Sequence, residues 1–205
     1  CTNICKTVII LGNHDFLANN LDRMDALSPL IESLDNRYVL FYKETGCYED
    51  ENIVWCVFSQ VTGSDRPQIE ESKKKYPNKK HIGLYHDPIL GLKTDVGYEF
   101  EDGQEVSIFE GLDWTLCGDI HKREVLQVNN RPVIMVGSLI QQNFGESINK
   151  HGFCIIDLEN YGSTVTATTA TAASIDNSYA AAYWPWLQLS DPDSRQLVWV
   201  PASTL

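Results

Sequence analysis

The feature that most constrains this chain is an apolar run near its beginning that ends in a cluster of polar residues. Residues 8–11 are four consecutive apolar residues, which indicates a buried strand. The run leads directly into Gly12-Asn13-His14-Asp15, where the glycine allows a sharp turn. Ligands of open α/β sheets bind beyond the carboxyl ends of strands. An amide, an imidazole and a carboxylate there indicate a metal site or acid–base chemistry, although a plain polar turn explains the tetrapeptide equally well.

Two further apolar runs end in the same way. Residues 81–85 are followed by His86-Asp87-Pro88, and residues 114–117 by Gly118-Asp119-Ile120-His121. A lone histidine after a strand is more often a surface residue than a ligand, but three of the five histidines lie at such ends. Imidazole, carboxylate and amide oxygen suit Mn²⁺, Fe²⁺ or Zn²⁺, and no cysteine stands among them to form a thiolate site. The candidate site residues are therefore Asn13, His14, His86, Asp119 and His121.

The remaining pattern predicts an α/β fold. Apolar residues at helical spacing indicate a helix over 24–34, which Pro29 shortens or kinks. A polar helix is expected over 68–76 and a short helix over 107–112. Further strands are expected over 38–42, 53–58, 124–128, 133–136 and 152–158, with an acidic turn at Glu49-Asp50-Glu51. A chain of 205 residues is long enough for one domain with a sizeable core.

Composition limits the function classes. The net charge of −12 argues against a generally basic surface for nucleic acid. It leaves room for a metal-assisted phosphate site, because the ligands of hard cations are themselves acidic. Lys73, Lys74, Lys75, Lys79 and Lys80 could contact a phosphate backbone, although a solvated surface is the more ordinary interpretation. Six cysteines without paired spacing indicate reduced thiols of a cytoplasmic protein, and no apolar run has the length of a membrane span.

The chain changes character after residue 158. The first 157 residues contain two alanines and every lysine, whereas the last 48 contain eight alanines and no lysine. We expect a linker over 159–173, where Ser, Thr and Ala dominate, and a short β-rich segment over 174–205 with strands at 186–189 and 197–200. The expected domains are thus 1–158, the linker, and 174–205.

Taken in order, Gly12-Asn13-His14-Asp15, His86 and Gly118-Asp119-Ile120-His121 resemble the later half of the calcineurin-like metallophosphoesterase signature. The closer resemblance is to the nuclease subunit of SbcCD-type DNA repair complexes, in particular the recombination endonuclease subunit of T-even-like bacteriophages. It is carried by His86-Asp87-Pro88-Ile89 and by residues 118–123 and 137–146, and it covers about residues 4–158.

The resemblance implies a two-metal phosphodiesterase that acts on DNA with an SbcC-type ATPase partner, with Mn²⁺ as the expected metal. Asn13 and His86 would bind one ion, with Asp119 in the place of the family's usual histidine, and His121 would bind the other. His14 would be the general acid, held by Asp15. Two ions in such sites clamp the attacking and leaving oxygens and activate a bound water.

The resemblance also predicts that part of the site is missing. The family's D-x-H and G-D-x-x-D motifs belong before residue 8, where the chain has seven residues. We therefore expect an incomplete metallophosphoesterase-type β-sandwich flanked by helices, with impaired nuclease activity, in the cytoplasm of an infected bacterial host.

The last segment resembles a different family. Residues 174–186 and 198–203 are similar to a contractile-phage tail sheath protein, although a generic β-hairpin with an aromatic cluster is an alternative interpretation. The competing hypothesis for the whole chain is a catalytically inactive fragment, or a fusion with a structural, sheath-like module that self-associates.

Overall fold

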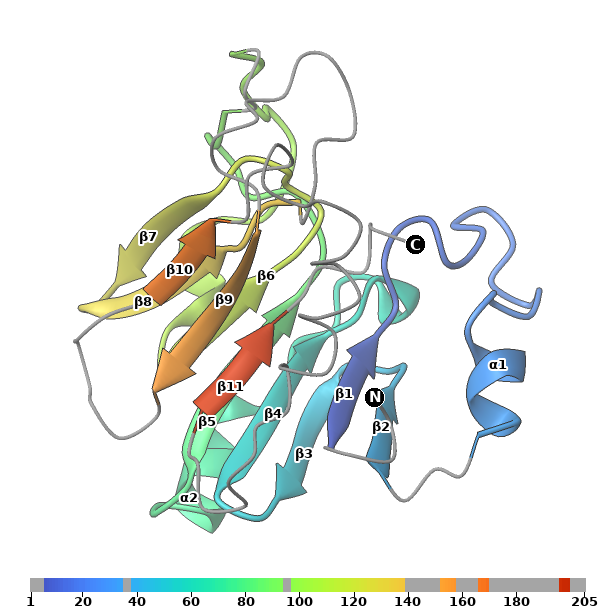
Figure 1. Ribbon diagram of the computed structural model, residues 1–205, viewed down its shortest axis with the longest axis horizontal. Coiled ribbons are helices and arrows are strands. Elements are labelled where there is room, and N and C mark those ends of the chain that lie inside the picture. The colour runs from blue at the N-terminus through green and yellow to red at the C-terminus, as the bar shows by residue number, and fades with distance from the viewer. Residues whose placement is uncertain are drawn as a thin grey trace, which may run out of the picture.

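The computed structural model describes residues 6–34, 38–93 and 97–138, together with three later strands, Gly152–Asp157, Thr166–Thr169 and Gln196–Trp199. This part of the chain is mixed α/β, with a six-stranded sheet and few helices (Figure 1). The α/β class predicted from the sequence is confirmed at this level.

The six-stranded sheet has the order β3-β4-β5-β6-β8-β7. Its central strands β4 (Ile53–Phe58), β5 (Lys80–Tyr85), β6 (Trp114–Cys117) and β8 (Arg131–Met135) run parallel. The edge strands β3 (Gly46–Asp50) and β7 (Glu124–Val128) are antiparallel to their neighbours. The predicted strands at 53–58, 114–117 and 124–128 are confirmed. The prediction of an acidic turn at 49–51 is wrong in part, because Glu49 and Asp50 end strand β3.

The register of β5 and β6 sets the position of the candidate site. Tyr85 pairs with Cys117, the last residue of β6. The amide of Gly118 donates to the carbonyl oxygen of Tyr85 at 2.9 Å, so the pairing extends by one residue. His86 and Gly118-Asp119 therefore leave the sheet side by side, at the same edge.

A second layer lies against one face of this sheet. It consists of the parallel pair β1 (Thr7–Ile10) and β2 (Val39–Tyr42) and of a three-stranded sheet, β10-β9-β11 (Figure 1). One buried cluster contains Ile10 from β1 and Cys154 and Ile156 from β9, together with Trp55, Ile82, Leu84, Leu116 and Ile134 from the large sheet. Burial of these apolar side chains holds the two layers together.

Tyrosine stacking and an ion pair join β1 and β2 to the edge of the large sheet. The rings of Tyr42 on β2 and Tyr48 on β3 are stacked, with centroids 4.2 Å apart. Lys6, just before β1, contacts Asp50 at 2.5 Å and Glu51 at 2.9 Å. These contacts connect the β1–β2 pair, which leads into the first polar cluster, to the edge strand β3.

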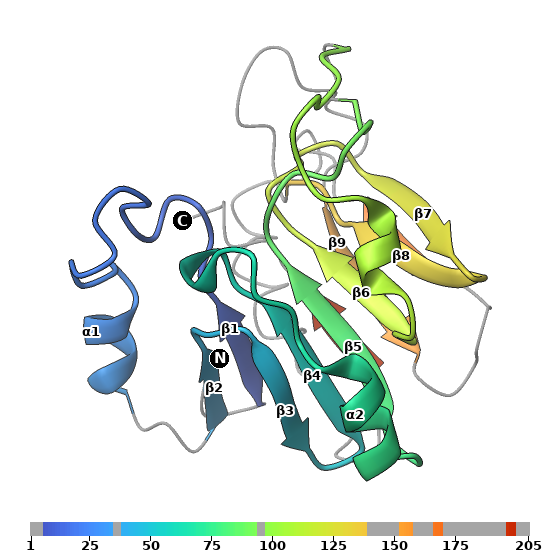
Figure 2. The same cartoon turned by 180° about the vertical axis from the view of Figure 1, so that it is seen from behind.

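The opposite face of the large sheet is covered by α2 (Ile69–Lys75) and by the 3-10 helix η3 (Val106–Phe109) (Figure 2), while a further 3-10 helix, η2 (Gln60–Thr62), follows β4. Phe58, Tyr85 and Phe109 pack edge to face there, with centroids 5.1 to 6.1 Å apart. The predicted helix at 68–76 is confirmed as α2, whereas the one at 107–112 is a short 3-10 helix. The helix predicted at 24–34 is reduced to α1 (Ser28–Glu32), which has Pro29 in its first turn and no buried residue.

The late strands β10 (Thr166–Thr169) and β11 (Gln196–Trp199) pair antiparallel with the two sides of β9 (Gly152–Asp157). Strand β11 lies close to the predicted strand at 197–200, whereas β10 falls inside the range expected to be a linker. Threonine favours strands, so the linker prediction, based on low complexity, missed this element. The predicted strand at 186–189 lies outside the described residues, and the division into domains stays a prediction.

Among the described residues, the helices are too short or too polar to cross a bilayer.

Core burial predicts where the fold is sensitive to mutation. Leu116 on β6 is 1% exposed and packs between the layers, whereas Val125 on β7 is 46% exposed. We expect Leu116→Ala to lower the free energy of unfolding by about 2–5 kcal/mol, because it leaves a cavity. Val125→Ala should change it by about 0.5 kcal/mol or less. Urea denaturation of both variants measures this, and equal losses would contradict the packing described.

Candidate functional site

Three polar side chains converge where β1, β5 and β6 end. The side-chain nitrogen Nδ2 of Asn13 donates to Oδ1 of Asp119 at 2.7 Å. Oδ1 of Asn13 lies 3.4 Å from Nε2 of His86, which is 4.0 Å from Oδ1 of Asp119. The structure thus brings together three of the residues selected from the sequence, although their role as ligands stays a prediction.

His86 lies between two glycines. It is 6% exposed, and a Cβ added to Gly12 would lie 2.9 Å from its Nε2. A Cβ added to Gly118 would lie 2.3 Å from its Nδ1, closer than any real contact. Neither glycine has a positive φ. The chain does turn sharply after Gly12, as the sequence predicts, but without a positive φ, and both glycines provide space for the imidazole ring.

Asp119 occupies a strained backbone position. Its φ is 66°, and the amide of Ile120 donates to the carbonyl oxygen of Gly118 at 2.8 Å. A positive φ at the centre of an i to i+2 hydrogen bond describes a γ-turn, an uncommon conformation. Strain of this kind clusters at functional sites. The turn holds the Asp119 carboxylate toward Asn13 and His86.

Asp15 organises the turn that carries Asn13 and His14. Its Oδ2 accepts a hydrogen bond from the amide of Gly12 at 2.7 Å, and its own amide donates to the carbonyl oxygen of Gly12 at 3.1 Å. The resemblance implied that Asp15 holds the imidazole of His14. The contact seen instead fixes the backbone, while the side chains of Asn13 and His14 are exposed.

His121 is held through its backbone. Its carbonyl oxygen accepts a hydrogen bond from the amide of Ser138 at 3.1 Å. Gly137 has a φ of 81°, and a Cβ there would lie 2.7 Å from the same oxygen. The Gly137-Ser138 turn therefore packs directly against the last polar cluster.

The candidate residues also affect one another electrostatically. Burial lowers the pKa of His86, and the imidazoles of His14 and His121 act in the same direction. The carboxylates of Asp119 and Asp15 oppose this effect. The balance favours neutral His86, which is the form of imidazole that binds metal ions.

The donor atoms fit a divalent ion in kind and approximately in spacing. Metal–ligand bonds of about 2.0–2.2 Å place neighbouring donors roughly 3–3.5 Å apart. The separation of 3.4 Å between Asn13 Oδ1 and His86 Nε2 agrees with this, and the 4.0 Å to Asp119 is slightly longer. Within the described ranges, no group of three or more His, Cys, Asp or Glu side chains is arranged to hold an ion. The candidate donor set therefore depends on the Asn13 amide.

Asp25 is a buried residue that sequence reasoning missed. Its carboxylate accepts hydrogen bonds from the amides of Leu27 at 3.0 Å and Ser28 at 2.7 Å and from the Ser28 hydroxyl at 2.7 Å. It also pairs with Lys43, just after β2, at 2.6 Å. The neighbouring amide of Ala26 donates to the Asp15 carbonyl oxygen at 2.8 Å. Asp25 thus stabilises the loop that follows Asp15. An acidic residue shortly before Ser28-Pro29 is a helix-start pattern, and this pattern could have drawn attention to Asp25 in the sequence.

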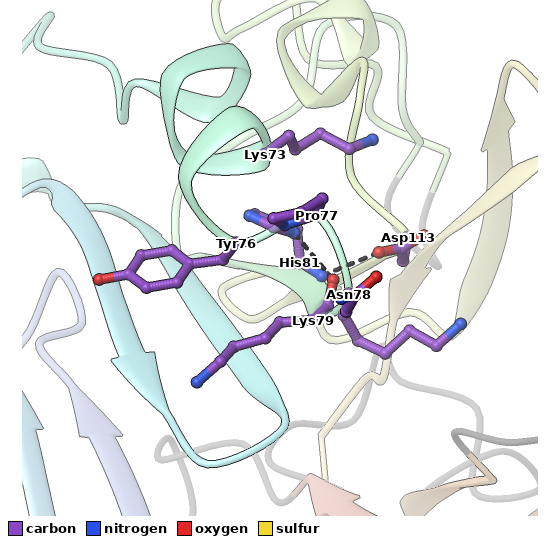
Figure 3. A pocket seen from close by; sticks show the side chains of 8 residues that line it. Lys73, Tyr76, Pro77, Asn78, Lys79, His81 and Asp113 are labelled. Atoms are coloured by element: carbon purple, nitrogen blue, oxygen red, sulfur yellow. Dashed lines mark hydrogen bonds between the residues drawn. The ribbon is translucent and has the colours of Figure 1, made fainter.

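The predicted basic segment lies at the other end of the sheet. Lys73, Tyr76, Lys79 and Lys80 line a pocket of about 260 Å³ beside the first residue of β5 (Figure 3). Lys73 donates to the carbonyl oxygen of Gly111 at 2.5 Å, Lys79 pairs with Glu49, and the His81 amide donates to Asp113 at 2.8 Å. Lys73, Lys79 and the His81 amide thus have local partners, and they lie at the opposite end of β5 from His86.

Comparison with known proteins gives little further guidance. No family model matches the chain. It is 40% identical over 156 residues, 73% of its length, to the uncharacterized protein R555 of Acanthamoeba polyphaga mimivirus. The aligned part is 12% of that viral protein, so the chain spans a small fraction of its relative. The match indicates kinship with a viral protein and names no activity.

The Asp25 network predicts a pH-dependent contribution to stability. Burial raises the pKa of Asp25, but hydrogen bonds from Lys43 and Ser28 outweigh it and bring the pKa from 3.8 to about 2. The stabilisation is therefore complete above the unfolded value and is lost as the pH falls toward 2. Asp25→Asn should cost about 1–3 kcal/mol at pH 7. By urea denaturation, the difference from the parent should fall by about half at pH 3. The exposed Asp65→Asn is the control, and a pH-independent difference would contradict this role.

The glycines around His86 give a second prediction. Gly118→Ala should destabilise the chain by about 1–3 kcal/mol through overpacking and should move the imidazole. Gly12→Ala should cost less, because its contact of 2.9 Å is less severe. Gly46→Ala is the control, since the atoms nearest to its Cβ would be those of the Tyr48 ring, at 3.3 Å. Thermal unfolding and the imidazole NMR signals of His86 test this order, and equal effects at positions 118 and 46 would contradict it.

Proposed function

We propose that the chain is the phosphodiesterase domain of a metal-dependent DNA nuclease of the calcineurin-like type. The observation that carries the proposal is the meeting of Asn13, His86 and Asp119, which follow three separate strands, around one point. A polar turn without function has no need of a buried histidine lodged between two glycines. The γ-turn at Asp119 supports the same interpretation.

The proposed architecture is a metallophosphoesterase-type β-sandwich. The six-stranded sheet would be one layer, and the strands around β1 and β9 would be the other. Packing of Ile10 and Ile156 against Leu84 and Leu116 supports this arrangement. The candidate site would then lie at one end of the interface between the layers.

Each polar residue has a proposed role. Asn13, His86 and Asp119 would bind one divalent ion, with Mn²⁺ as the expected metal, and His121 would bind a second ion. Such ions neutralise charge on the phosphodiester and lower the pKa of a bound water. The exposed imidazole of His14 would donate a proton to the leaving oxygen, and Asp15 would keep His14 in position through the turn at Gly12.

The proposed substrate is DNA, and the proposed partner is an SbcC-type ATPase. A chain of net charge −12 repels a polyanion at long range, so the bound cations would have to supply local attraction. The kinship with a mimivirus protein fits a viral setting. Action in an infected bacterial cell and sheath-like self-association through the last segment remain proposals that rest on the resemblances alone.

Metal binding is the first test. We expect Mn²⁺ to bind the chain weakly, measured by isothermal titration, and Asp119→Asn to weaken binding roughly tenfold or more. Asparagine tolerates the positive φ at this position, so the substitution removes charge and preserves the turn. Asp65→Asn, an exposed aspartate on a loop, should leave binding unchanged. Equal binding by all three proteins would contradict the assignment of Asp119.

Catalysis is the second test. Hydrolysis of bis-p-nitrophenyl phosphate and of linear duplex DNA should require Mn²⁺ and be slow. His14→Ala should reduce the rate by about 100-fold, the usual contribution of a general acid. The exposed His14 lies outside the core, so this variant should unfold at the same temperature as the parent. A chain with neither Mn²⁺ binding nor turnover would instead support the catalytically inactive alternative.

A further inference from the structure

Two cysteines face each other across the edge of the large sheet. Cys47 on β3 and Cys56 on β4 are paired directly in the antiparallel register, and their sulfur atoms are 3.5 Å apart. Cys56 is fully buried, whereas Cys47 is only partly buried. All four cysteines in the described part of the chain are free thiols. The pair lies on the face covered by α2, away from the candidate metal site.

Two buried polar side chains, Ser72 on α2 and His81 on β5, lie on the same side of the large sheet as this pair. The oxygen of the Ser72 side chain on α2 is 3.0 Å from Nε2 of His81, and the same side chain lowers the pKa of Cys47. Ser72 and His81 are themselves buried. Cys47 thus faces the Cys56 thiol at 3.5 Å within an otherwise apolar cluster.

We propose that Cys47 and Cys56 form a redox-active dithiol that peroxide converts to a reversible disulfide, with Cys47 as the nucleophile and Cys56 as the resolving thiol. The proposal does not depend on the nuclease function. It assigns a modification site to residues that the candidate metal site does not use.

The chemistry balances with hydrogen peroxide as the oxidant. The Cys47 thiolate attacks one peroxide oxygen, the O–O bond breaks, and the departing hydroxide takes up a proton, which leaves a sulfenic acid on Cys47. The Cys56 thiol then loses its proton and attacks the Cys47 sulfur. The S–S bond forms as the S–O bond breaks, and the departing hydroxide takes that proton as water. Two thiols supply two electrons, and one peroxide becomes two waters.

The surroundings favour this order of events. A hydrogen bond from the Cys56 thiol lowers the pKa of Cys47 to about 7, with burial opposing and Ser72 assisting. The same hydrogen bond and burial raise the pKa of Cys56. The thiolate therefore forms on the more accessible sulfur. By contrast, burial raises the pKa of Cys154 to about 11 and also raises that of Cys117.

The strand geometry permits the bond. Directly opposed residues of antiparallel strands have Cα atoms about 4.5–5.5 Å apart, within the range of disulfides. The sulfur atoms must approach by roughly 1.5 Å to reach a bond of about 2.05 Å. β3 is an edge strand, so it can move toward β4 without losing a partner on its other side in the described sheet.

Peptide mapping under non-reducing conditions tests the inference. The experiment uses the full chain with Cys1→Ser and Cys5→Ser, which removes the two cysteines that precede Lys6. A few equivalents of peroxide should link the Cys47 and Cys56 peptides, with loss of two hydrogens, and dithiothreitol should reverse the link. Cys47 should react roughly tenfold or more faster than Cys117 and Cys154. Equal rates for the three, or no linked peptide from the folded chain, would overturn the proposal.

Two variants separate the roles. Cys56→Ser should accumulate a sulfenic acid on Cys47, trapped by dimedone, and Cys47→Ser should leave Cys56 unoxidised. Dimedone labelling at Cys56 in the Cys47→Ser chain would reverse the assignment of nucleophile and resolving thiol. Should either variant fail to fold, the parent chain in urea provides the comparison. In urea, Cys47 should no longer react faster with peroxide than Cys117 and Cys154. If Cys47 still reacts faster in urea, the folded geometry does not cause its reactivity.

Discussion

The fit of one imidazole ring between two backbones is the constraint on which the candidate site depends. His86 leaves β5 at the edge where β6 also ends, and its ring fills the space that side chains at positions 12 and 118 would occupy. Asn13 and Asp119 follow these two glycines directly, so the same close approach that encloses the ring also brings their oxygens toward it.

The sequence predicts strands β5 and β6 of this site well because they are buried on both faces. A continuous apolar run such as the one on β4 is a strong signal, and its boundaries match the structure. The three polar clusters were found because each follows such a run directly. The register of β5 and β6 then accounts for their meeting, since parallel strands end at a common edge.

Other features lacked a local signal. Strand β3 was missed because Glu49 and Asp50 suggested a turn, whereas pairing with β4 and contacts with Lys6 stabilise an extended conformation. The role of Asp25 depends on Lys43, a residue whose proximity only the fold provides. The space requirement at Gly118 and the γ-turn at Asp119 depend on backbone geometry, which residue types alone do not specify. The opposition of Cys47 and Cys56 likewise required the register of β3 and β4.

The site is also a joint between sheets. Asn13 follows β1, which pairs only with β2 in the described sheets, while His86 and Asp119 follow strands β5 and β6 of the large sheet. A ligand bound at once by Asn13 and by His86 and Asp119 would stabilise the interface that Ile10 and Leu84 form. By mass action, each tenfold rise in the ligand concentration above the dissociation constant would stabilise the packed arrangement of the two layers by about 1.4 kcal/mol. The stability of the packing between the two layers would then increase as the candidate site fills.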